Sequence, residues 1–208
     1  MKKYYSLIIM LIAVCMFAGC SGLNENETEG TIQEHDTRTI VDLAGEEVEI
    51  PAVVNKVCGS YPALEAIFLL VGSPEKNVAV NDSNINNEWY LKMYPELANN
   101  VRVFSGTNEV NVETLLEIKP DVVIVGSVEL KETIADLGIP VVLAKTSSTE
   151  DIINTILMVG EVMGEKEYAT AQKLVAYFKD NMAQATVITD SIAKENRPTV
   201  FYAASGTL

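Results

Sequence analysis

The sequence predicts an α/β fold, a parallel-sheet lobe with flanking helices, preceded by a β-hairpin and followed by a long connector helix. Two observations lead to this prediction: valine-rich segments alternate with segments of helical spacing, and a long uninterrupted helical pattern follows them. A strand, helix, strand rhythm is typical of a parallel sheet with right-handed crossovers. We expect a ligand of such a sheet to bind at the carboxyl ends of the strands.

The strand candidates share a short apolar run with β-branched residues. They are "KVCGS" from Lys56, "NVAVN" from Asn77, "VRVFS" from Val101, "DVVIVGS" from Asp121 and "PVVLAK" from Pro140. The helix candidates between and after them cover residues 62–72, 87–97, 111–119, 130–138 and 149–164.

A β-hairpin is predicted ahead of the first strand of the sheet. In "TRTIVDLAGEEVEIP", residues 37–51, apolar and polar residues alternate on both sides of an Ala-Gly turn. The folded region is therefore predicted to begin near Arg38, with this hairpin.

A single long helix is predicted near the end of the chain. Residues 165–195 contain no Gly or Pro, and their apolar residues recur at three- and four-residue steps. At 1.5 Å per residue this helix is roughly 45 Å long. The alternative is two helices broken near "QATVIT", residues 184–189, where β-branched residues weaken helix propensity.

Composition limits the classes of function. The 208 residues are 48% hydrophobic and 21% charged, which suits one globular domain or one and a half. The 29 acidic and 15 basic residues give a net charge of -14, which argues against a nucleic acid or an anionic membrane surface as a docking partner. Because nucleophile-elbow, P-loop, dinucleotide-binding and paired metal-ligand motifs are all missing from the sequence, we predict a protein that is not an enzyme and needs no cofactor.

The N-terminus has the pattern of a secretory signal. Residues 1–19 combine "MKK" with a short apolar stretch, and Ala18, Gly19 and Cys20 resemble the lipobox of bacterial lipoproteins. The resemblance implies that Cys20 is acylated. The acidic, polar composition of the segment that follows predicts that residues 20–37 form a flexible spacer. The alternative is an ordinary signal peptide with an incidental cysteine. Cys58 is predicted to be a small core residue, the alternative being a thiol at the rim of a site.

The order of motifs after Arg38 resembles one family of transport proteins. "TIVDLAGEEVEIP", "KVCGSYPALEAIFLLVG", "NVETLLEIKPDVVIVG" and "LGIPVV" precede the long helix, as in the solute-binding lipoproteins of ABC importers for iron-siderophores, haem and cobalamin. The similarity runs from Arg38 to the last residue. It implies two α/β lobes joined by one long helix, with the ligand held between the lobes.

This resemblance implies a division of the chain into domains. Residues 38–149 would form the N-terminal ligand-binding lobe, residues 150–196 the helical connector, and residues 197–208 the first strand of a second lobe. The apolar run "TVFYAAS" from Thr199 supports that last strand. On this resemblance the second lobe would be missing, so we expect a truncated chain and a half-cleft that binds its ligand weakly.

The resemblance also implies which residues face the ligand. These lie in the loops that follow the strands of the lobe: Ser60, Tyr61, Asn81, Trp89, Tyr90, Thr107, Asn108 and Ser127. Tyr and Trp suit such a site because each offers flat apolar area with a polar tip. For Trp89 the alternative is a residue of the lobe core.

The predicted ligand is a metal chelate of the ferric siderophore type. The only histidine, His35, falls in the spacer, which disfavours haem, although Tyr90 or Met93 could still serve as an axial ligand. Cobalamin is disfavoured because Thr107 stands where relatives often have an aromatic residue. The scarcity of basic residues in the loops argues against a bare oxyanion or a strongly anionic siderophore.

The partners implied by the resemblance are an ABC permease and its ATPase. In relatives, an acidic residue at the position of Glu113 pairs with arginines of the permease; the alternative for Glu113 is a favourable place in the first turn of a helix. Lipid attachment at Cys20 would hold the protein on the outer face of the cytoplasmic membrane. The alternative function is a lipid-anchored single-lobe interaction protein, or a truncated fragment that does not deliver solute.

Overall fold

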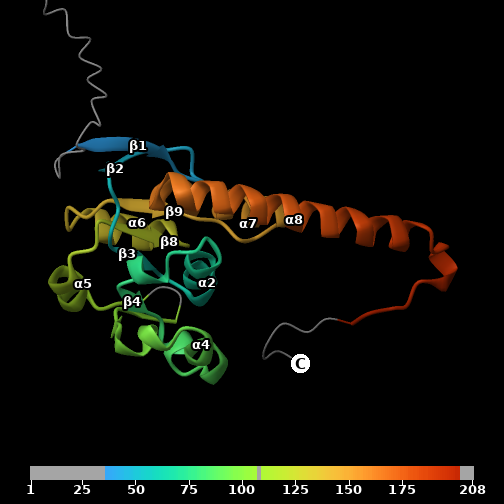
Figure 1. The fold of residues 1–208 in the computed structure, drawn as a ribbon, viewed down its shortest axis with the longest axis horizontal. Helices are drawn as coiled ribbons and strands as arrows, with labels where there is room; N and C mark the ends of the chain where they lie inside the picture. Colours follow the sequence, from blue (N-terminus) through green and yellow to red (C-terminus); the bar gives the residue numbers. More distant parts are fainter. Residues whose placement is uncertain (1–35, 107–108, 202–208) are drawn as a thin grey trace, which may run out of the picture. The chain divides into compact units, whose positions relative to one another are not determined.

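The computed structural model describes residues 36–106 and 109–201 (Figure 1). The predicted signal peptide, Cys20, nearly all of the spacer, Thr107, Asn108 and residues 202–208 lie outside the described residues. Within them the fold is a parallel sheet with flanking helices, as the sequence predicts.

The central sheet is parallel and fully buried. It consists of β3 (Val57–Gly59), β8 (Val122–Val125) and β9 (Val141–Leu143), in the order β3-β8-β9. A bridge from Val57 to Asn77 continues the sheet toward β4 (Ala79–Val80), which pairs in parallel with β5 (Val101–Arg102). Near-continuous apolar strands are typical of a parallel sheet buried on both faces.

One predicted strand is divided in the structure. The segment 101–105 splits into β5 and β6 (Phe104–Ser105), and β6 turns to pair in antiparallel fashion with β7 (Glu109–Val110). The sequence did not predict β7. The junction is fixed by the backbone N–H of Asn111, which donates to the carbonyl oxygen of Val103 at 2.8 Å.

Five of the described α-helices ahead of the long helix lie where their spacing predicts them, although several are shorter, and a sixth, α3, was not predicted. They are α2 (Pro62–Leu70), α3 (Asp82–Ile85), α4 (Glu88–Met93), α5 (Val112–Ile118), α6 (Val128–Ala135) and α7 (Thr149–Met163), with 3-10 turns η1 (Pro74–Lys76) and η2 (Pro95–Asn99). Five of them begin with a side-chain N-cap, from Asn81, Asn87, Asn111, Ser127 and Ser148. Short polar caps of this kind satisfy the unpaired backbone N–H groups of a first turn.

The predicted hairpin is confirmed and is fastened to the lobe by its turn. It consists of β1 (Thr37–Val41) and β2 (Glu47–Pro51) in antiparallel register. The buried Asp42 carboxylate accepts from the backbone of Ala44 and Glu46, and Lys131 Nζ lies 2.5 Å from it. These bonds hold the pKa of Asp42 below its usual value despite the opposing effect of burial.

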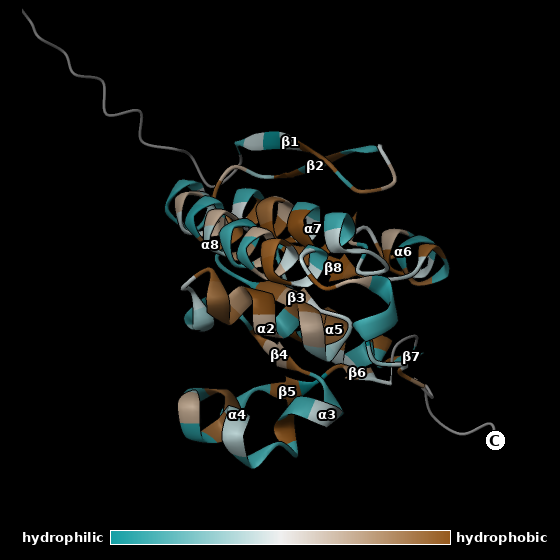
Figure 2. Ribbon diagram, turned by 90° about the vertical axis from the view of Figure 1, so that its right-hand side faces the viewer, coloured by the Kyte–Doolittle hydropathy of each residue, from teal (hydrophilic) through white to brown (hydrophobic). Residues whose placement is uncertain are grey.

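The two faces of the sheet bury different side chains, because successive residues of a strand point to opposite sides. Val57, Val122 and Ile124 join the cluster that also contains buried residues of α2, α7 and the hairpin. Cys58 and Val123 join the cluster that contains residues of α5 and α6. The apolar strands therefore lie between helices on both sides (Figure 2).

Cys58 is a core residue, as predicted. Its side chain is fully buried, and burial together with the nearby Glu65 raises the pKa of its thiol far above the usual value. No helix within the described part of the chain is long and apolar enough to cross a membrane.

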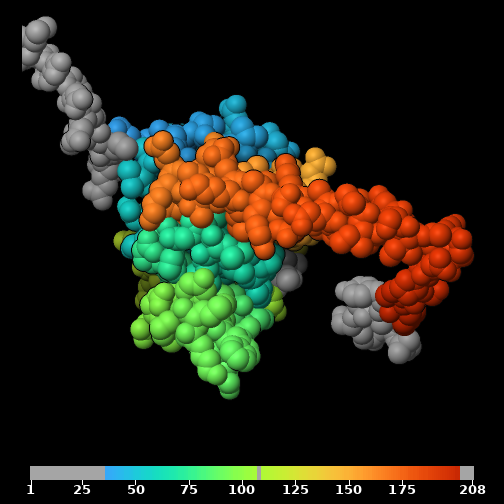
Figure 3. All heavy atoms as spheres, turned by 45° about the vertical axis from the view of Figure 1, so that its right-hand side comes forward, coloured from blue at the N-terminus to red at the C-terminus, as the bar shows by residue number. Residues whose placement is uncertain are grey.

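The long helix is a single helix, α8 (Glu165–Asp190), and it packs against α7 over its first half. Its 26 residues extend about 39 Å. The helices approach closely at Gly160, where a Cβ atom would lie 2.6 Å from Cβ of Ala171. From Lys179 onward every described residue is exposed, and this half of α8 stands clear of the lobe (Figure 3).

The end of the long helix differs from the prediction. It stops at Asp190, and the 3-10 turn η3 (Lys194–Asn196) follows where the sequence pattern continued to residue 195. The reason is local. The β-branched residues near this end, together with Asp190 and Ser191, have low helix propensity, so the helix ends there. Thr199, Val200 and Phe201, the described part of the predicted last strand, belong to no strand.

Candidate functional site

Loops from four parallel strands of the lobe meet at the carboxyl edge of the sheet. Ser60 and Tyr61 follow β3, Asn81 follows β4, and Ser127 follows β8. Thr146, which the sequence analysis did not single out, follows β9 and joins them. The structure therefore brings most of the predicted ligand-facing loops together at one edge.

Ser60 holds two of these loops in place. Its side chain is fully buried, and its hydroxyl oxygen accepts a hydrogen bond from the backbone N–H of Gly126 at 3.2 Å. Its carbonyl oxygen accepts from Asn81 Nδ2 at 3.5 Å. Ser60 thus links the ends of β3, β4 and β8 from inside the protein.

Tyr61 contacts the loops that follow β8 and β9. Its hydroxyl donates to Thr146 Oγ1 at 3.3 Å, and its ring covers Gly126 so closely that a Cβ there would lie 2.5 Å from Cε1. Burial raises the pKa of Tyr61, against a smaller opposing effect of the bond to Thr146. The phenol is therefore neutral near pH 7 and can donate or accept a hydrogen bond.

Asn81 has its side chain fully engaged within the protein. Its Oδ1 accepts from the backbone N–H of Ser83 at 2.9 Å and caps α3. Its Nδ2 donates to the carbonyl oxygen of Gly106 at 3.0 Å, which ties the β4 loop to the loop after β6. Asn81 thus sets the position of the loops around it.

A buried carboxyl group lies behind Asn81. Glu65 of α2 is fully buried, and it accepts hydrogen bonds from the backbone N–H of Asn81 and from Asn84 Nδ2, the latter at 2.6 Å. Burial raises its pKa to about 7, although both hydrogen bonds act in the opposite direction. The only signal of this group in the sequence is one Glu within the apolar run "PALEAIFLL".

Trp89 and Tyr90 are adjacent on α4 but have opposite environments. The Trp89 side chain is 74% exposed, so the alternative that it belongs to the lobe core is wrong. Lys92 Nζ lies 4.8 Å from the centre of its ring. Tyr90 is buried with Leu69 and Leu97, and its hydroxyl has no hydrogen-bond partner among the described residues.

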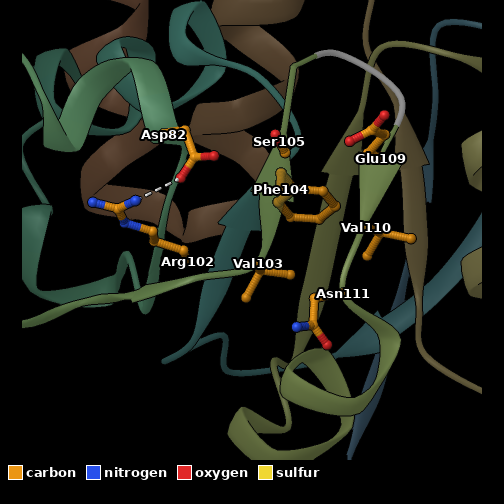
Figure 4. Close-up of a pocket in the computed structure, with 8 residues that line it drawn as sticks. All are labelled: Asp82, Arg102, Val103, Phe104, Ser105, Glu109, Val110 and Asn111. Carbon is orange, nitrogen blue, oxygen red and sulfur yellow. Dashed lines mark ion pairs between the residues drawn. The ribbon is translucent and has the colours of Figure 1, made fainter.

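A polar pocket of about 440 Å³ opens beside these loops (Figure 4). Arg102 and Asp82 form an ion pair of 3.4 Å on one side of it, and the Phe104 ring lies between them and Glu109. The remaining lining residues are Val103, Ser105, Val110 and Asn111. The only described cation of this pocket is therefore already paired with a carboxylate.

Ser127 and Glu113 begin neighbouring helices. The Ser127 hydroxyl oxygen accepts from the backbone N–H of Leu130 at 3.1 Å, and its side chain borders a cavity of about 100 Å³. Glu113 is exposed in the first turn of α5, where the helix dipole favours a negative charge. Within the described ranges, no group of three or more His, Cys, Asp or Glu side chains is placed to hold a metal ion.

Comparison with protein families gives a match over most of the chain. Residues 57–207 fit the family model described as periplasmic binding protein. This range begins at β3 and includes every predicted ligand-facing residue and Glu113.

Two curated relatives from Bacillus subtilis (strain 168) are similar along most of this chain. An uncharacterized ABC transporter substrate-binding lipoprotein, YvrC, is 25% identical over 205 residues, which are 94% of this chain and 62% of the relative. The iron(3+)-hydroxamate-binding protein YxeB is 26% identical over 172 residues, which are 81% of this chain and 50% of that protein. The chain thus spans between half and two thirds of the length of these relatives.

Solved structures show the same fold. A periplasmic solute binding protein from Veillonella parvula DSM 2008 superimposes with a TM-score of 0.65 at 28% identity. The match covers 72% of this chain and 47% of the other chain. The match thus spans about half of the Veillonella parvula protein.

Proposed function

This chain belongs to the periplasmic binding protein family, and we propose that it forms the solute-binding face of an extracytoplasmic component of an ABC importer. The family consists of binding proteins, in agreement with the prediction that the chain is not an enzyme. The proposed solute is a ferric chelate of the siderophore type, in keeping with the relative YxeB, which is named as an iron(3+)-hydroxamate-binding protein.

The observation that carries this proposal is the meeting of the loops after β3, β4, β8 and β9 at one edge of the sheet. There the neutral phenol of Tyr61 presents an apolar ring and one polar group. Such a surface suits an organic chelate whose metal is already enclosed by its own ligands. The lack of an unpaired cation in the described pocket argues against a bare oxyanion.

The proposed cleft has two walls, and the loops described above form one of them. Since the matched relatives are considerably longer, we propose that their remaining residues form a second lobe and close the cleft. Alone, the present loops would cover one side of the solute and bind it weakly.

The remaining parts of the proposal concern the membrane. Cys20 is proposed to carry the lipid anchor, which places the protein on the outer face of the cytoplasmic membrane. The proposed partners are the importer's permease and its ATPase, with Glu113 as one docking residue. Its exposure at the start of α5 supports that role.

The docking role of Glu113 is tested by uptake of a radioactive ferric hydroxamate into cells. Glu113→Gln, made in a version of the protein that carries two lobes, should reduce uptake severalfold and leave solute affinity unchanged, because rim charges guide docking. Glu117→Gln on the same helix is the matched control, since Glu117 is also exposed. Equal uptake by both variants and the parent would refute the docking role.

The solute-binding role is tested by fluorescence of Trp89, the only tryptophan of the chain. The full chain in detergent is titrated with the ferric complex of desferrioxamine B. We expect saturable quenching of Trp89 fluorescence in the parent and a much weaker response in Tyr61→Ala. The variant also serves as the control for light absorbed by the coloured complex. Identical curves for both proteins would contradict the proposal.

A second function, that of a lipid-anchored interaction protein, is favoured by one observation. The second half of α8 carries the exposed apolar residues Met182, Val187 and Ile188. Exposed apolar patches of this kind often mark a protein contact. Absence of a Trp89 response to any ferric chelate would favour this function over solute binding.

A further inference from the structure

We propose that Glu65 is a positioning residue whose buried carboxyl group holds the turn Asn81–Asn84 at the solute-binding edge and couples the opening of that turn to pH. The proposal rests on the proposed function in one respect, namely that this edge receives the solute. The hydrogen bonds that carry it stand independently of any ligand.

The geometry links one buried side chain to both ends of the turn. One oxygen of Glu65 accepts from the backbone N–H of Asn81, and the other accepts from Asn84 Nδ2 at 2.6 Å. Asn84 Nδ2 also lies 3.3 Å from the carbonyl oxygen of Pro62. The turn is therefore fastened to α2, whose N-terminal neighbour is Tyr61.

The turn Asn81–Asn84 also fixes the position of polar groups that line the candidate site. Asn81 binds the loop after β6 through the carbonyl oxygen of Gly106, and Asp82 lies on the wall of the 440 Å³ pocket, paired with Arg102. Because α3 has four residues, it supplies little rigidity of its own. Release of Glu65 would therefore loosen one wall of the site.

The surroundings of Glu65 explain a response to pH. The titratable groups that interact with it are the Cys58 thiol from β3 and the Tyr90 phenol from α4, and both are held neutral by burial. No described cation forms an ion pair with it. Burial thus raises the pKa of Glu65 to about 7, and opening the turn to water would return it toward 4.5.

The sign of the effect follows from this difference. The closed turn binds the proton more tightly than the opened turn, so closure is favoured at low pH and weakens as pH rises through about 7. Glu65→Gln removes the titration. Its NH₂ group cannot accept a hydrogen bond, whereas the O–H oxygen of a protonated carboxyl group still can, so Glu65→Gln leaves one of the two donors without a partner at every pH.

The test is amide hydrogen exchange of residues 81–86 in the full chain without ligand, corrected for intrinsic exchange rates, between about pH 5.5 and 8. Protection in the parent should fall as pH rises, by about tenfold per pH unit at most. In Glu65→Gln it should be independent of pH and about tenfold lower at the acidic end. Glu75→Gln, an exposed Glu of η1, should match the parent.

A swapped pair separates positioning from general damage to the fold. Glu65→Gln/Asn84→Asp reverses the direction of the hydrogen bond between the two side chains and should restore protection at the acidic end. It should also restore the dependence on pH, since it returns a carboxyl group to the same buried place. An unchanged pH profile in Glu65→Gln, or no recovery in the swapped pair, would overturn the proposal.

Binding of ferric desferrioxamine B to the same variants distinguishes the two proposals. If the parent binds it, Glu65→Gln should weaken affinity severalfold, and equal affinity would contradict a positioning role at the site. If the parent does not bind it while the exchange results agree with expectation, the positioning of the turn is supported and the proposed solute is refuted.

Discussion

The two sides of the candidate site are built differently. On the side of β3, β8 and β9, three fully buried parallel strands present Ser60, Tyr61 and Thr146, and the side chains of Ser60 and Tyr61 join their loops by hydrogen bonds. On the side of β4, α3 and α4, the buried strand has only two residues, the helices have four and six, and most of α4 is exposed.

The difference shows how a short segment such as Asn81–Asn84 can be held in position without a large hydrophobic core beneath it. The first side owes its position to strand pairing and apolar burial on both faces. The second side depends on a few hydrogen bonds to Glu65 and on the small cluster around Tyr90. We expect the second side to open locally at lower free energy than the first.

The largest expected effect comes from titration of Glu65. Because its pKa is about 7 in the folded protein and near 4.5 when exposed, the free energy of unfolding should fall as pH rises, by about 3 kcal/mol across that window. Urea unfolding of the parent and of Glu65→Gln between about pH 5 and 8 measures it. Parallel curves for the two proteins would show that Glu65 does not titrate in this range.

A change on the rigid side should act through packing and not through pH. Gly126→Val would place a Cβ within 2.5 Å of the Tyr61 ring, so the ring must move and the bond to Thr146 must break. We expect a loss of about 2 kcal/mol in stability and of solute binding. The same substitution in a Tyr61→Ala background should cost much less, and an equal cost there would contradict this contact.

The smallest effect should come from Tyr90. Its buried hydroxyl has no partner among the described residues, so Tyr90→Phe removes an unsatisfied polar group and should raise the free energy of unfolding by about 1 kcal/mol. Tyr94→Phe on the neighbouring, partly exposed ring is the control. A clear loss of stability in Tyr90→Phe would mean that the hydroxyl has a hydrogen bond after all.

Much of the fold could be predicted because its signals are local. Valine-rich runs, the helical spacing of apolar residues and the uninterrupted pattern from Glu165 predict the sheet, most of the helices and α8. The division between β5 and β6 could not be predicted, since Val101–Ser105 is a continuous strand pattern in sequence. Its break is set by pairing with β7 and by the bond from Asn111.

The site was predictable as a set of loops but not as a network. Strand ends indicated Ser60, Tyr61, Asn81 and Ser127, while the use of their polar groups inside the protein depends on partners distant in sequence. Spacing alone could not decide which of Trp89 and Tyr90 is buried. It also gave no sign that Glu65 points inward, because a single Glu in an apolar helix can equally face solvent.

The central claim is that the carboxyl edge of this sheet binds a ferric chelate, and isothermal titration calorimetry tests it most directly. The full chain in detergent is titrated with ferric desferrioxamine B, with the iron-free chelator and Tyr61→Ala as controls. We predict saturable binding of the ferric complex to one site, weakened at least tenfold by Tyr61→Ala. Absence of binding heat, or equal affinity in the variant, would contradict the claim.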